Sequence, residues 1–378
     1  MFALTEEQEA FRGSVRAFAE KSVAPNAAGA DETASFPWAS FHAYRDAGFL
    51  GSPYPEEFGG DGIDSVTYAV LIEELARVCA STALSVLISR LGVSAILKHG
   101  SPELQARYVP GVVTGDHQFS YCLSESNAGS DVAAMQTRAV RDGDHYVLSG
   151  QKLWITNAGI SDCYTVFAKT DPEAGRRGIS AFVVERDWSG FSVGKVEHKM
   201  GMRGSPTAEI VFDDVRVPVA NRIGEEGRGF AYAMGALDGS RPIIGAQALG
   251  IAQGALDAAT RYAKDRRQFG HPIAEFQGVQ FLLADMDTQV EAARLLVYRA
   301  CAALDAGDPR VSKYASIAKL FASDAAMRVT TDAVQVFGGA GYTTDFPVER
   351  MMRDAKVTQI YEGTNQIQRV VIGKHLLG

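Results

Sequence analysis

Three blocks with different patterns of apolar side chains follow one another along the 378-residue chain. Residues 1–118 repeat apolar side chains at helical spacing. Residues 119–225 contain short β-rich runs separated by Gly, Asp, Asn and Pro, and residues 226–378 return to long helical patterns. Strands and helices do not alternate, which argues against a parallel Rossmann sheet. The order predicts an α+β fold with an N-terminal α-helical domain (1–118), a central antiparallel β-sheet domain or small barrel (119–225) and a C-terminal four-helix bundle (226–378).

Local signals place several helix ends. Thr5 opens a capping box in TEEQ, and Ser101 is a predicted N-cap followed by proline. The Gly338-Gly339 pair predicts the end of a long helix. In LDGSRP (237–242) a proline lies inside an otherwise helical run, which predicts a break there. Small Ala and Ser side chains on both faces of the C-terminal helices indicate close packing, either within a monomeric bundle or between subunits.

Composition excludes several classes of function. The net charge of −8 argues against nucleic acid as the main partner, because phosphate binding needs basic surface. The four cysteines and seven histidines show no metal-ligand spacing, so we expect no catalytic metal and reduced cysteines in the core. The N-terminus does not resemble a signal peptide, and Arg90 interrupts the most apolar stretch. A soluble, cytoplasmic protein with no membrane partner is expected.

One short segment near the end of the chain raises a chemical question. In QIYEGTNQIQR (359–369), Glu362 stands between apolar neighbours and Gly363. In one interpretation Gly363 ends a helix, Thr364 or Asn365 caps the next, and Glu362 is solvated. In the other, the carboxylate faces an apolar pocket because it has a chemical task there.

Three other segments have the chemistry to bind a ligand. YCLSESNAGSD (121–131) offers backbone N–H groups and hydroxyls, although an ordinary polar loop has the same composition. KLWITNAG (152–159) places an indole beside a hydroxyl, which suits a planar heterocycle as well as a core position. RYAKDRRQFG (261–270) gathers basic side chains at a helix end, where Arg266 is either solvated or bound to a pyrophosphate. G-x-G-x-x-G, G-x-S-x-G, H-E-x-x-H and the P-loop are absent, so a Rossmann-bound dinucleotide is not indicated.

Taken together, these segments resemble the acyl-CoA dehydrogenase family of flavoproteins. Six blocks match in order across essentially the whole chain: YCLSESNAGSD, WITNAG, RRQFG, QVFGGAGY, MMRDAK and QIYEGTNQIQR. The chain looks most like the short- and medium-chain group, whose catalytic glutamate lies in an IYEGT motif that Glu362 matches. The isovaleryl and long-chain groups place the base on the helix that contains DGSRP, where this chain has Ser240 or Gly239.

The resemblance implies FAD-dependent α,β-dehydrogenation of a short- to medium-chain acyl-CoA to the trans-2-enoyl-CoA. Glu362 would take the α-proton and flavin N5 would accept the hydride from the β-carbon. Near neutral pH the carboxylate must be more basic than its ordinary pKa of about 4.3, and burial in an apolar pocket has that effect. The main-chain N–H of Glu362 and a flavin ribityl hydroxyl would hold the thioester oxygen.

The resemblance also assigns binding residues and partners. Cofactor contacts fall on Tyr121, Leu123, Ser124, Ser130, Trp154, Ile155, Thr156, Arg266, Phe269, Gln277, Gln335, Gly338, Gly339, Thr364 and Gln366. Substrate contacts fall on Ser130, Asp238, Arg241, Tyr361 and Gly363. Some of the FAD contacts would come from a neighbouring subunit, so a homotetramer is expected, with an electron-transferring flavoprotein as electron acceptor. The loop 124–127 reads Ser-Glu-Ser-Asn instead of the family's more usual Thr-Glu-Pro version.

Three alternatives stay open at this point. A relative with the same fold could act on an acyl group bound to a carrier protein or use O₂ as the acceptor. A nitroalkane-oxidase-like enzyme is disfavoured because its base is an aspartate, and a non-enzymatic flavin-binding scaffold is disfavoured by the presence of Glu362 and Arg266. The acyl pocket is expected to draw on residues 84–97 and on the segment around Tyr361.

Overall fold

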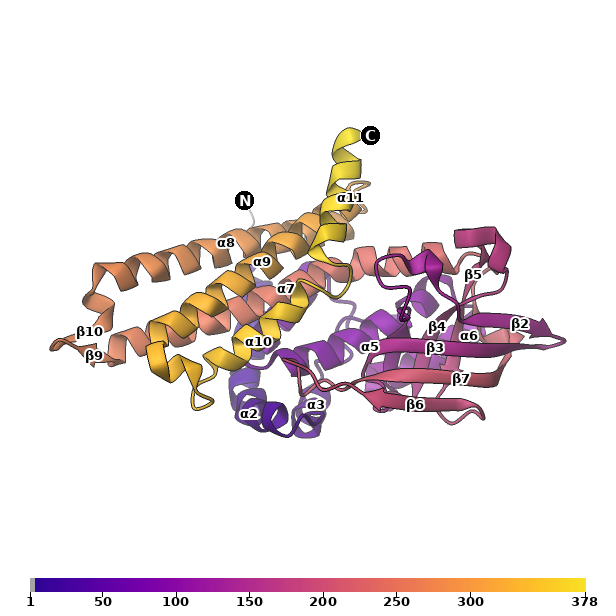
Figure 1. Ribbon diagram of the computed structural model, residues 1–378, viewed down its shortest axis with the longest axis horizontal. Helices are drawn as coiled ribbons and strands as arrows, with labels where there is room; N and C mark the ends of the chain where they lie inside the picture. The colour runs from indigo at the N-terminus through magenta and orange to yellow at the C-terminus, as the bar shows by residue number, and fades with distance from the viewer. Residues whose placement is uncertain (1–3) are drawn as a thin grey trace.

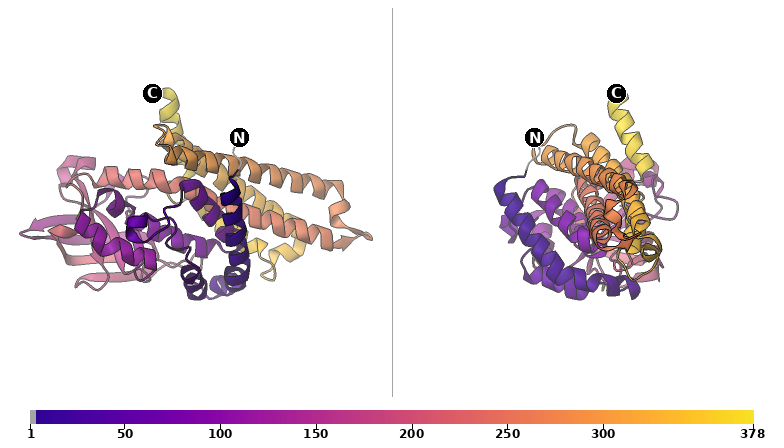
Figure 2. Two further views of the ribbon diagram at one scale, coloured as in Figure 1. Left: turned by 180° about the vertical axis from the view of Figure 1, so that it is seen from behind. Right: turned by 90° about the vertical axis from the view of Figure 1, so that its left-hand side faces the viewer.

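The computed structural model describes residues 4–378, and it has a sheet domain at one end and a long helical bundle at the other (Figure 1). The N-terminal helices pack against the bundle along one side, as Figure 2 shows from behind. These helices are α1 (Glu6–Phe18), α2 (Ala24–Glu32), α3 (Trp38–Asp46), α4 (Ser65–Val78), α5 (Ala80–His99) and α6 (Pro102–Thr114). The predicted α+β organisation is therefore confirmed.

The capping signals in the first block are confirmed. The Thr5 side chain accepts a hydrogen bond from the Gln8 backbone N–H, and the Gln8 side chain accepts one from Thr5 in return. Ser101 Oγ accepts the Leu104 N–H at 3.3 Å, with Pro102 at the first position of α6. Because these bonds satisfy amide groups that a helix leaves free at its N-terminus, the local sequence is enough to set where these helices begin.

The sheet is mostly antiparallel, and its strands follow the spatial order β6-β7-β3-β2-β4-β5-β8. Two pairings differ from the prediction, because β1 and β2 run parallel to β4. Parallel neighbours need a long connection, and the β2–β3 hairpin and its flanking loops supply it between β1 and β4. The strands are β1 (Phe119–Cys122), β2 (Arg138–Asp142), β3 (His145–Thr156), β4 (Cys163–Lys169), β5 (Ile179–Glu185), β6 (Phe191–Val196), β7 (Thr207–Pro218) and β8 (Arg222–Ile223).

The C-terminal bundle is built from four helices that pack on one another. They are α7 (Gly229–Asp265), α8 (Gln277–Asp305), α9 (Val311–Phe337) and α10 (Val348–Thr358). A short hairpin, β9 (Arg267–Gln268) and β10 (His271–Pro272), joins α7 to α8, and α11 (Asn365–Leu377) projects from the body (Figure 1). Gly338 ends α9 with a φ of +60°, as the glycine pair predicts.

The predicted break at Pro242 is wrong, because α7 continues through it. A proline inside a helix removes one N–H and so leaves the carbonyl four residues earlier, that of Asp238, without its usual partner. Pro242 is buried among the bundle helices, and their packing keeps the helix continuous there.

Two further expectations concern the core. All four cysteines are buried and unpaired, which agrees with core residues. Helix α5 is long and apolar enough to cross a membrane, but 89% of its apolar window is buried inside the fold. A buried helix of this kind belongs to the protein core and needs no lipid.

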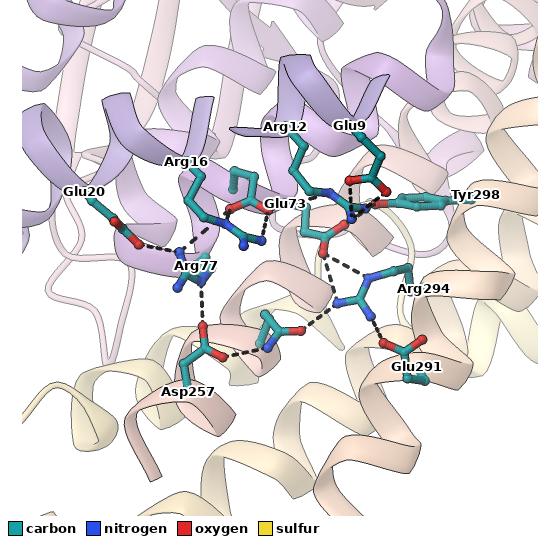
Figure 3. Close-up of polar contacts among 12 residues, drawn as sticks. Glu9, Arg12, Arg16, Glu20, Glu73, Arg77, Asp257, Glu291, Arg294 and Tyr298 are labelled. Atoms are coloured by element: carbon teal, nitrogen blue, oxygen red, sulfur yellow. Dashed lines mark hydrogen bonds and ion pairs between the residues drawn. The ribbon is translucent and has the colours of Figure 1, made fainter. Parts of the chain in front are cut away.

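A network of buried charges joins the N-terminal helices to the bundle (Figure 3). Arg16 of α1 forms a two-point contact with Glu74 of α4, at 2.9 and 2.7 Å. Glu73 of α4 accepts hydrogen bonds from Arg294 of α8 at 3.1 Å and from the Tyr298 hydroxyl at 2.6 Å. Glu73 and Glu74 are almost fully buried, so each depends on its partners for stabilisation.

Replacing Arg294 by Met should destabilise the protein, because it leaves the Glu73 carboxylate buried without a cation. We expect the free energy of unfolding, measured by urea titration, to fall by about 3–5 kcal/mol. The matched control is Arg216→Met, which removes an exposed pair with Asp142 and should cost less than about 1 kcal/mol. Equal losses in the two variants would contradict the structural importance of the buried network.

Candidate active site

The segment between α10 and α11 has an unusual backbone. Glu362 has a φ of +56° and Gly363 a φ of +89°, so two consecutive residues lie in the left-handed region. For a non-glycine residue this conformation costs about 1–3 kcal/mol and persists only where the surroundings impose it. Thr364 caps α11 as predicted, with its hydroxyl accepting the Ile367 N–H at 3.3 Å. Gly363 does not end a helix, since α10 stops at Thr358.

Side chains from α7, α9 and α11 hold the carbonyl groups of this turn. Lys319 Nζ donates to the Gly363 carbonyl at 2.9 Å, and Gln368 Nε2 donates to the same oxygen at 2.8 Å. Arg241 Nε approaches the Glu362 carbonyl at 3.4 Å. Within residues 4–378, the Glu362 N–H donates to no acceptor. The turn therefore has its carbonyls fixed, and the Glu362 N–H is free to donate to a ligand.

The Glu362 carboxylate is partly buried, and among the described residues its one hydrogen-bond donor is Ser240 of α7. The distance from Ser240 Oγ to Glu362 Oε2 is 2.7 Å. Burial raises the pKa of Glu362, while the Ser240 hydrogen bond and the positive charges of Arg241 and Lys319 act in the opposite direction. The interpretation of Glu362 as a freely solvated side chain does not agree with this environment.

Two cations lie behind the turn. Lys319 is fully buried, and its Nζ also donates to Asn365 Oδ1 at 2.9 Å. Burial lowers the pKa of Lys319 to about 7. Arg241 is 5% exposed and pairs with Asp238 at 2.6 Å, which brings together two of the predicted substrate residues. Lys319 was missed by the sequence analysis, although a lysine among the Ala, Ser and Phe of SIAKLFAS is a detectable signal.

A cavity of about 360 Å³ lies between α4, α5 and α7 and reaches Ser240. Apolar side chains such as Leu87, Leu91 and Ile243 form much of its wall. The stretch 84–97 contributes to the wall as expected. Tyr361 does not line this cavity, and its hydroxyl donates to Gln247 instead. Ser240 on α7 therefore links the two, because it lines the cavity and donates a hydrogen bond to the Glu362 carboxylate. The lining is Pro53, Ile63, Ser65, Tyr68, Leu87, Arg90, Leu91, Ser94, Lys98, Ala236, Gly239, Ser240, Ile243 and Leu304.

The predicted flavin-face residues come together at the end of β3. Trp154 has a φ of +58° and its side chain is 56% exposed, although it lies within a strand. The register of β3 against β7 shifts between Lys152 and Ile155, which turns the indole outward. The Leu153 N–H donates to the Ser124 carbonyl at 2.9 Å, so the 123–125 loop lies beside it. Tyr121 and Ile155 are buried beneath this surface, Thr156 is partly buried, and Ser130 is exposed.

A buried ion pair supports this loop. Lys152 Nζ donates to Glu125 Oε1 at 2.7 Å and to the Leu123 carbonyl at 3.1 Å. Although burial opposes it, the Lys152 charge and hydrogen bonds hold the pKa of Glu125 below its ordinary value. This pair was not predicted from the sequence. Strand alternation could have found it, because Lys152 falls on the same face as buried Tyr146 and Leu148.

A second group of predicted cofactor residues lies elsewhere. Within one chain these residues sit at the end of the bundle opposite α11 (Figure 1), in the hairpin and at the helix ends beside it, and all are exposed. Their predicted contact with a neighbouring subunit's FAD stays a prediction. The group is Arg266, Phe269, Gln277, Gln335, Gly338 and Gly339. Gln366 is exposed near the start of α11, four residues after Glu362 in the sequence.

Comparison with known families covers nearly the whole chain. Residues 5–116, 120–215 and 227–377 match the N-terminal, middle and C-terminal domains of acyl-CoA dehydrogenase. A probable acyl-CoA dehydrogenase of Mycobacterium tuberculosis is 55% identical over 377 residues, covering 100% of this chain and 97% of the relative. A short-chain-specific acyl-CoA dehydrogenase of Clostridium acetobutylicum is 50% identical, covering 98% of both.

A solved structure agrees with the sequence matches. The butyryl-CoA dehydrogenase of Megasphaera elsdenii superposes with a TM-score of 0.97 at 44% identity, and the match covers 100% of both chains. Family models, relatives and fold agree over the full length of the chain. The protein belongs to the acyl-CoA dehydrogenase family and is an oxidoreductase that acts on acyl-CoA.

Proposed function

We propose that this protein catalyses the FAD-dependent α,β-dehydrogenation of a short- to medium-chain acyl-CoA to the trans-2-enoyl-CoA, with Glu362 as the catalytic base. The observation that carries the proposal is the Glu362 carboxylate, which is held in a strained turn, partly buried and bonded to a residue of the adjoining cavity. A short acyl chain is favoured by the cavity volume of about 360 Å³, near the lower end of the roughly 300–1,000 Å³ of ligand pockets.

Glu362 has the environment that proton abstraction next to a thioester requires. A carboxylate in water is too weak a base, and burial raises the pKa of Glu362 toward the working pH. The Ser240 hydroxyl, which belongs to the cavity lining, holds the carboxylate in place by a hydrogen bond. The free N–H of Glu362 is the donor for the thioester oxygen, where negative charge develops as the proton leaves. Gly363 has no side chain beside that oxygen.

The surface around Trp154 fits a flavin. An exposed indole in a strained conformation, next to the backbone and hydroxyl groups of the Ser124 loop, suits a flat heterocycle with polar edges. Leu123, Ser124, Trp154 and Thr156 would hold the ring, with Tyr121 and Ile155 packed beneath it. When bound there, FAD supplies the acceptor for the hydride that leaves the β-carbon.

The same proposal includes partners and assembly. Phe269, Tyr342 and Phe281 are 91%, 89% and 60% exposed in the C-terminal half of the chain, which is the composition of a surface covered by another subunit. We infer a homotetramer in which Arg266, Gln277 and Gly338 reach a neighbour's FAD. A cytoplasmic location and an electron-transferring flavoprotein as acceptor complete the proposal.

Glu362→Gln should abolish proton abstraction without altering the shape of the site. We expect kcat to fall by about 10²–10⁴-fold while the protein still binds FAD and stays yellow. The measurement is anaerobic bleaching of the flavin band by straight and branched acyl-CoAs of increasing length. Glu226→Gln, which changes a carboxylate on the sheet domain, is the matched control.

The outcomes of these flavin measurements test the base, the substrate, the electron acceptor and the cofactor separately. Full turnover by the Gln variant would disprove the assignment of the base. A wild-type flavin that is reduced by dithionite and by no acyl-CoA would favour a carrier-protein-bound substrate. Rapid reoxidation of substrate-reduced flavin by air would favour O₂ as the acceptor. A protein that cannot be reconstituted with FAD would disprove the proposed function.

Ser240→Ala should shift the pH dependence of the reaction upward. The hydroxyl stabilises the ionised form of Glu362, so its removal raises the pKa of that carboxyl further and moves the acid limb of kcat/KM to higher pH. Ser312→Ala is the control, because Ser312 donates to Asp238 at 3.1 Å and not to Glu362. An unchanged acid limb in the Ser240 variant would show that this hydrogen bond does not tune the base.

Phe269→Ser should weaken assembly and FAD retention together. Its ring is almost fully exposed in the single chain, so we expect a smaller sedimentation coefficient and a lower ratio of flavin to protein absorbance. Val196→Ser replaces an exposed apolar residue on the sheet and should change neither quantity. A variant that loses assembly and still retains its full complement of FAD would contradict the proposed link between subunits and cofactor.

A further inference from the structure

The cavity beside Glu362 contains positive charge that no carboxylate of its own lining neutralises. Arg90 and Lys98, both on α5, belong to its lining, and the lining includes no Asp or Glu. Arg90 is the residue that interrupts the most apolar stretch of the sequence. A purely aliphatic acyl chain gains nothing from a guanidinium in its pocket and would leave that cation desolvated.

The Arg90 guanidinium has spare hydrogen-bonding capacity. Within residues 4–378, its only hydrogen bond runs from Nε to the Pro53 carbonyl, at 3.3 Å, and the guanidinium carbon lies 5.3 Å from the centre of the Tyr54 ring. Its two terminal nitrogens are the forked donors that recognise a carboxylate at two points. Burial and the charge of Arg90 lower the pKa of Lys98, with Asp238 acting in the opposite direction.

An independent sign of a missing partner comes from Tyr68 on α4. Its side chain lines the same cavity, is 8% exposed, and has a hydroxyl with no hydrogen-bond partner in the described chain. Buried hydroxyls are almost always paired, and leaving one unpaired costs about 1–3 kcal/mol. Burial raises the pKa of Tyr68, so this hydroxyl remains a donor at any physiological pH.

The position of these donors relative to the base indicates what they bind. Tyr68 belongs to the α4 wall of the cavity and Arg90 to the α5 wall. Ser240, which contacts Glu362, belongs to the α7 wall. Apolar side chains, among them Leu87, Leu91 and Ile243, complete the lining. A ligand that meets both walls is an acyl chain with its thioester near Glu362 and an anionic group at its other end.

We infer that the substrate is an ω-carboxyacyl-CoA, whose distal carboxylate is bound by the Arg90 guanidinium and the Tyr68 hydroxyl. This inference rests on the proposed function and adds the substrate class to it. Arg90 and Tyr68 are then specificity residues, which act on the end of the chain remote from the reacting carbons. Lys98 adds positive charge to the same cavity.

The test compares substrates that differ only in the distal group. Glutaryl-CoA is paired with pentanoyl-CoA, and adipyl-CoA with hexanoyl-CoA, so that chain length is constant within each pair. We expect wild-type kcat/KM to favour the dicarboxylic member of at least one pair by about tenfold or more. Arg90→Met should reduce that preference by about 10- to 100-fold, and Tyr68→Phe by a smaller factor, since each removes a hydrogen bond to a charged group. Arg90→Lys, which keeps the charge, should restore part of the preference.

A binding measurement separates this inference from the proposed function. In the Glu362→Gln background turnover is expected to be about 10²–10⁴-fold slower, so calorimetry reports the affinity for glutaryl-CoA and pentanoyl-CoA. Adding Arg90→Met should weaken only glutaryl-CoA binding, and adding Arg216→Met, on the sheet surface, should change neither. Equal affinity for the two ligands would overturn the inference. So would an Arg90→Met substitution that weakens the binding of both ligands by the same factor. If no acyl-CoA reduces the wild-type flavin, the proposed function fails, and the calorimetric comparison still decides whether the cavity binds a distal carboxylate.

Discussion

The rest of the site depends on the left-handed turn at Glu362 and Gly363. A left-handed backbone is unfavourable by itself at a non-glycine residue, so its geometry is set by side chains from three helices that donate hydrogen bonds to it. Lys319 from α9, Gln368 from α11 and Arg241 from α7 all donate to its carbonyls. This arrangement fixes the carboxylate against Ser240 and keeps the Glu362 N–H free. Position 363 favours glycine because its φ of +89° lies in the left-handed region, and a Cβ there would also lie 2.8 Å from Gln368 Nε2.

Charge near the turn is balanced in a way that suits proton transfer. Burial raises the pKa of Glu362, and the neighbouring cations limit that rise, so the carboxyl can still ionise. Burial also lowers the pKa of Lys319 to about 7, with the Glu362 charge acting in the opposite direction. Such opposed shifts are common where a protein positions an acid or base, although structural ion pairs produce them as well. The ion pair between Glu125 and Lys152 has a structural role, since it holds the Ser124 loop against β3.

Much of this organisation was predictable because it rests on local chemistry. The capping residues Thr5, Ser101 and Thr364 bond to amides within a few positions, so their effect does not depend on distant contacts. The Glu362 motif and the tryptophan block were recognisable for a different reason, which is their resemblance to blocks of the acyl-CoA dehydrogenase family. Pro242 was misjudged, because a local helix-breaking preference is outweighed by burial within the bundle. The parallel pairing of β1 with β4 was also missed, since pairing direction depends on where a strand enters the sheet.

By itself, the sequence determined the order of the helical and β-rich blocks, the helix ends and the identity of the acidic residue placed beside a glycine. These features follow from side-chain periodicity and hydrogen bonds over three or four residues. Only the tertiary structure decided that Ser240 meets Glu362, that Lys319 holds the turn, and that Arg90 and Tyr68 share a cavity. Those contacts join residues between 22 and 122 positions apart, and chain folding alone brings them together, because no local pattern encodes a partner at that distance.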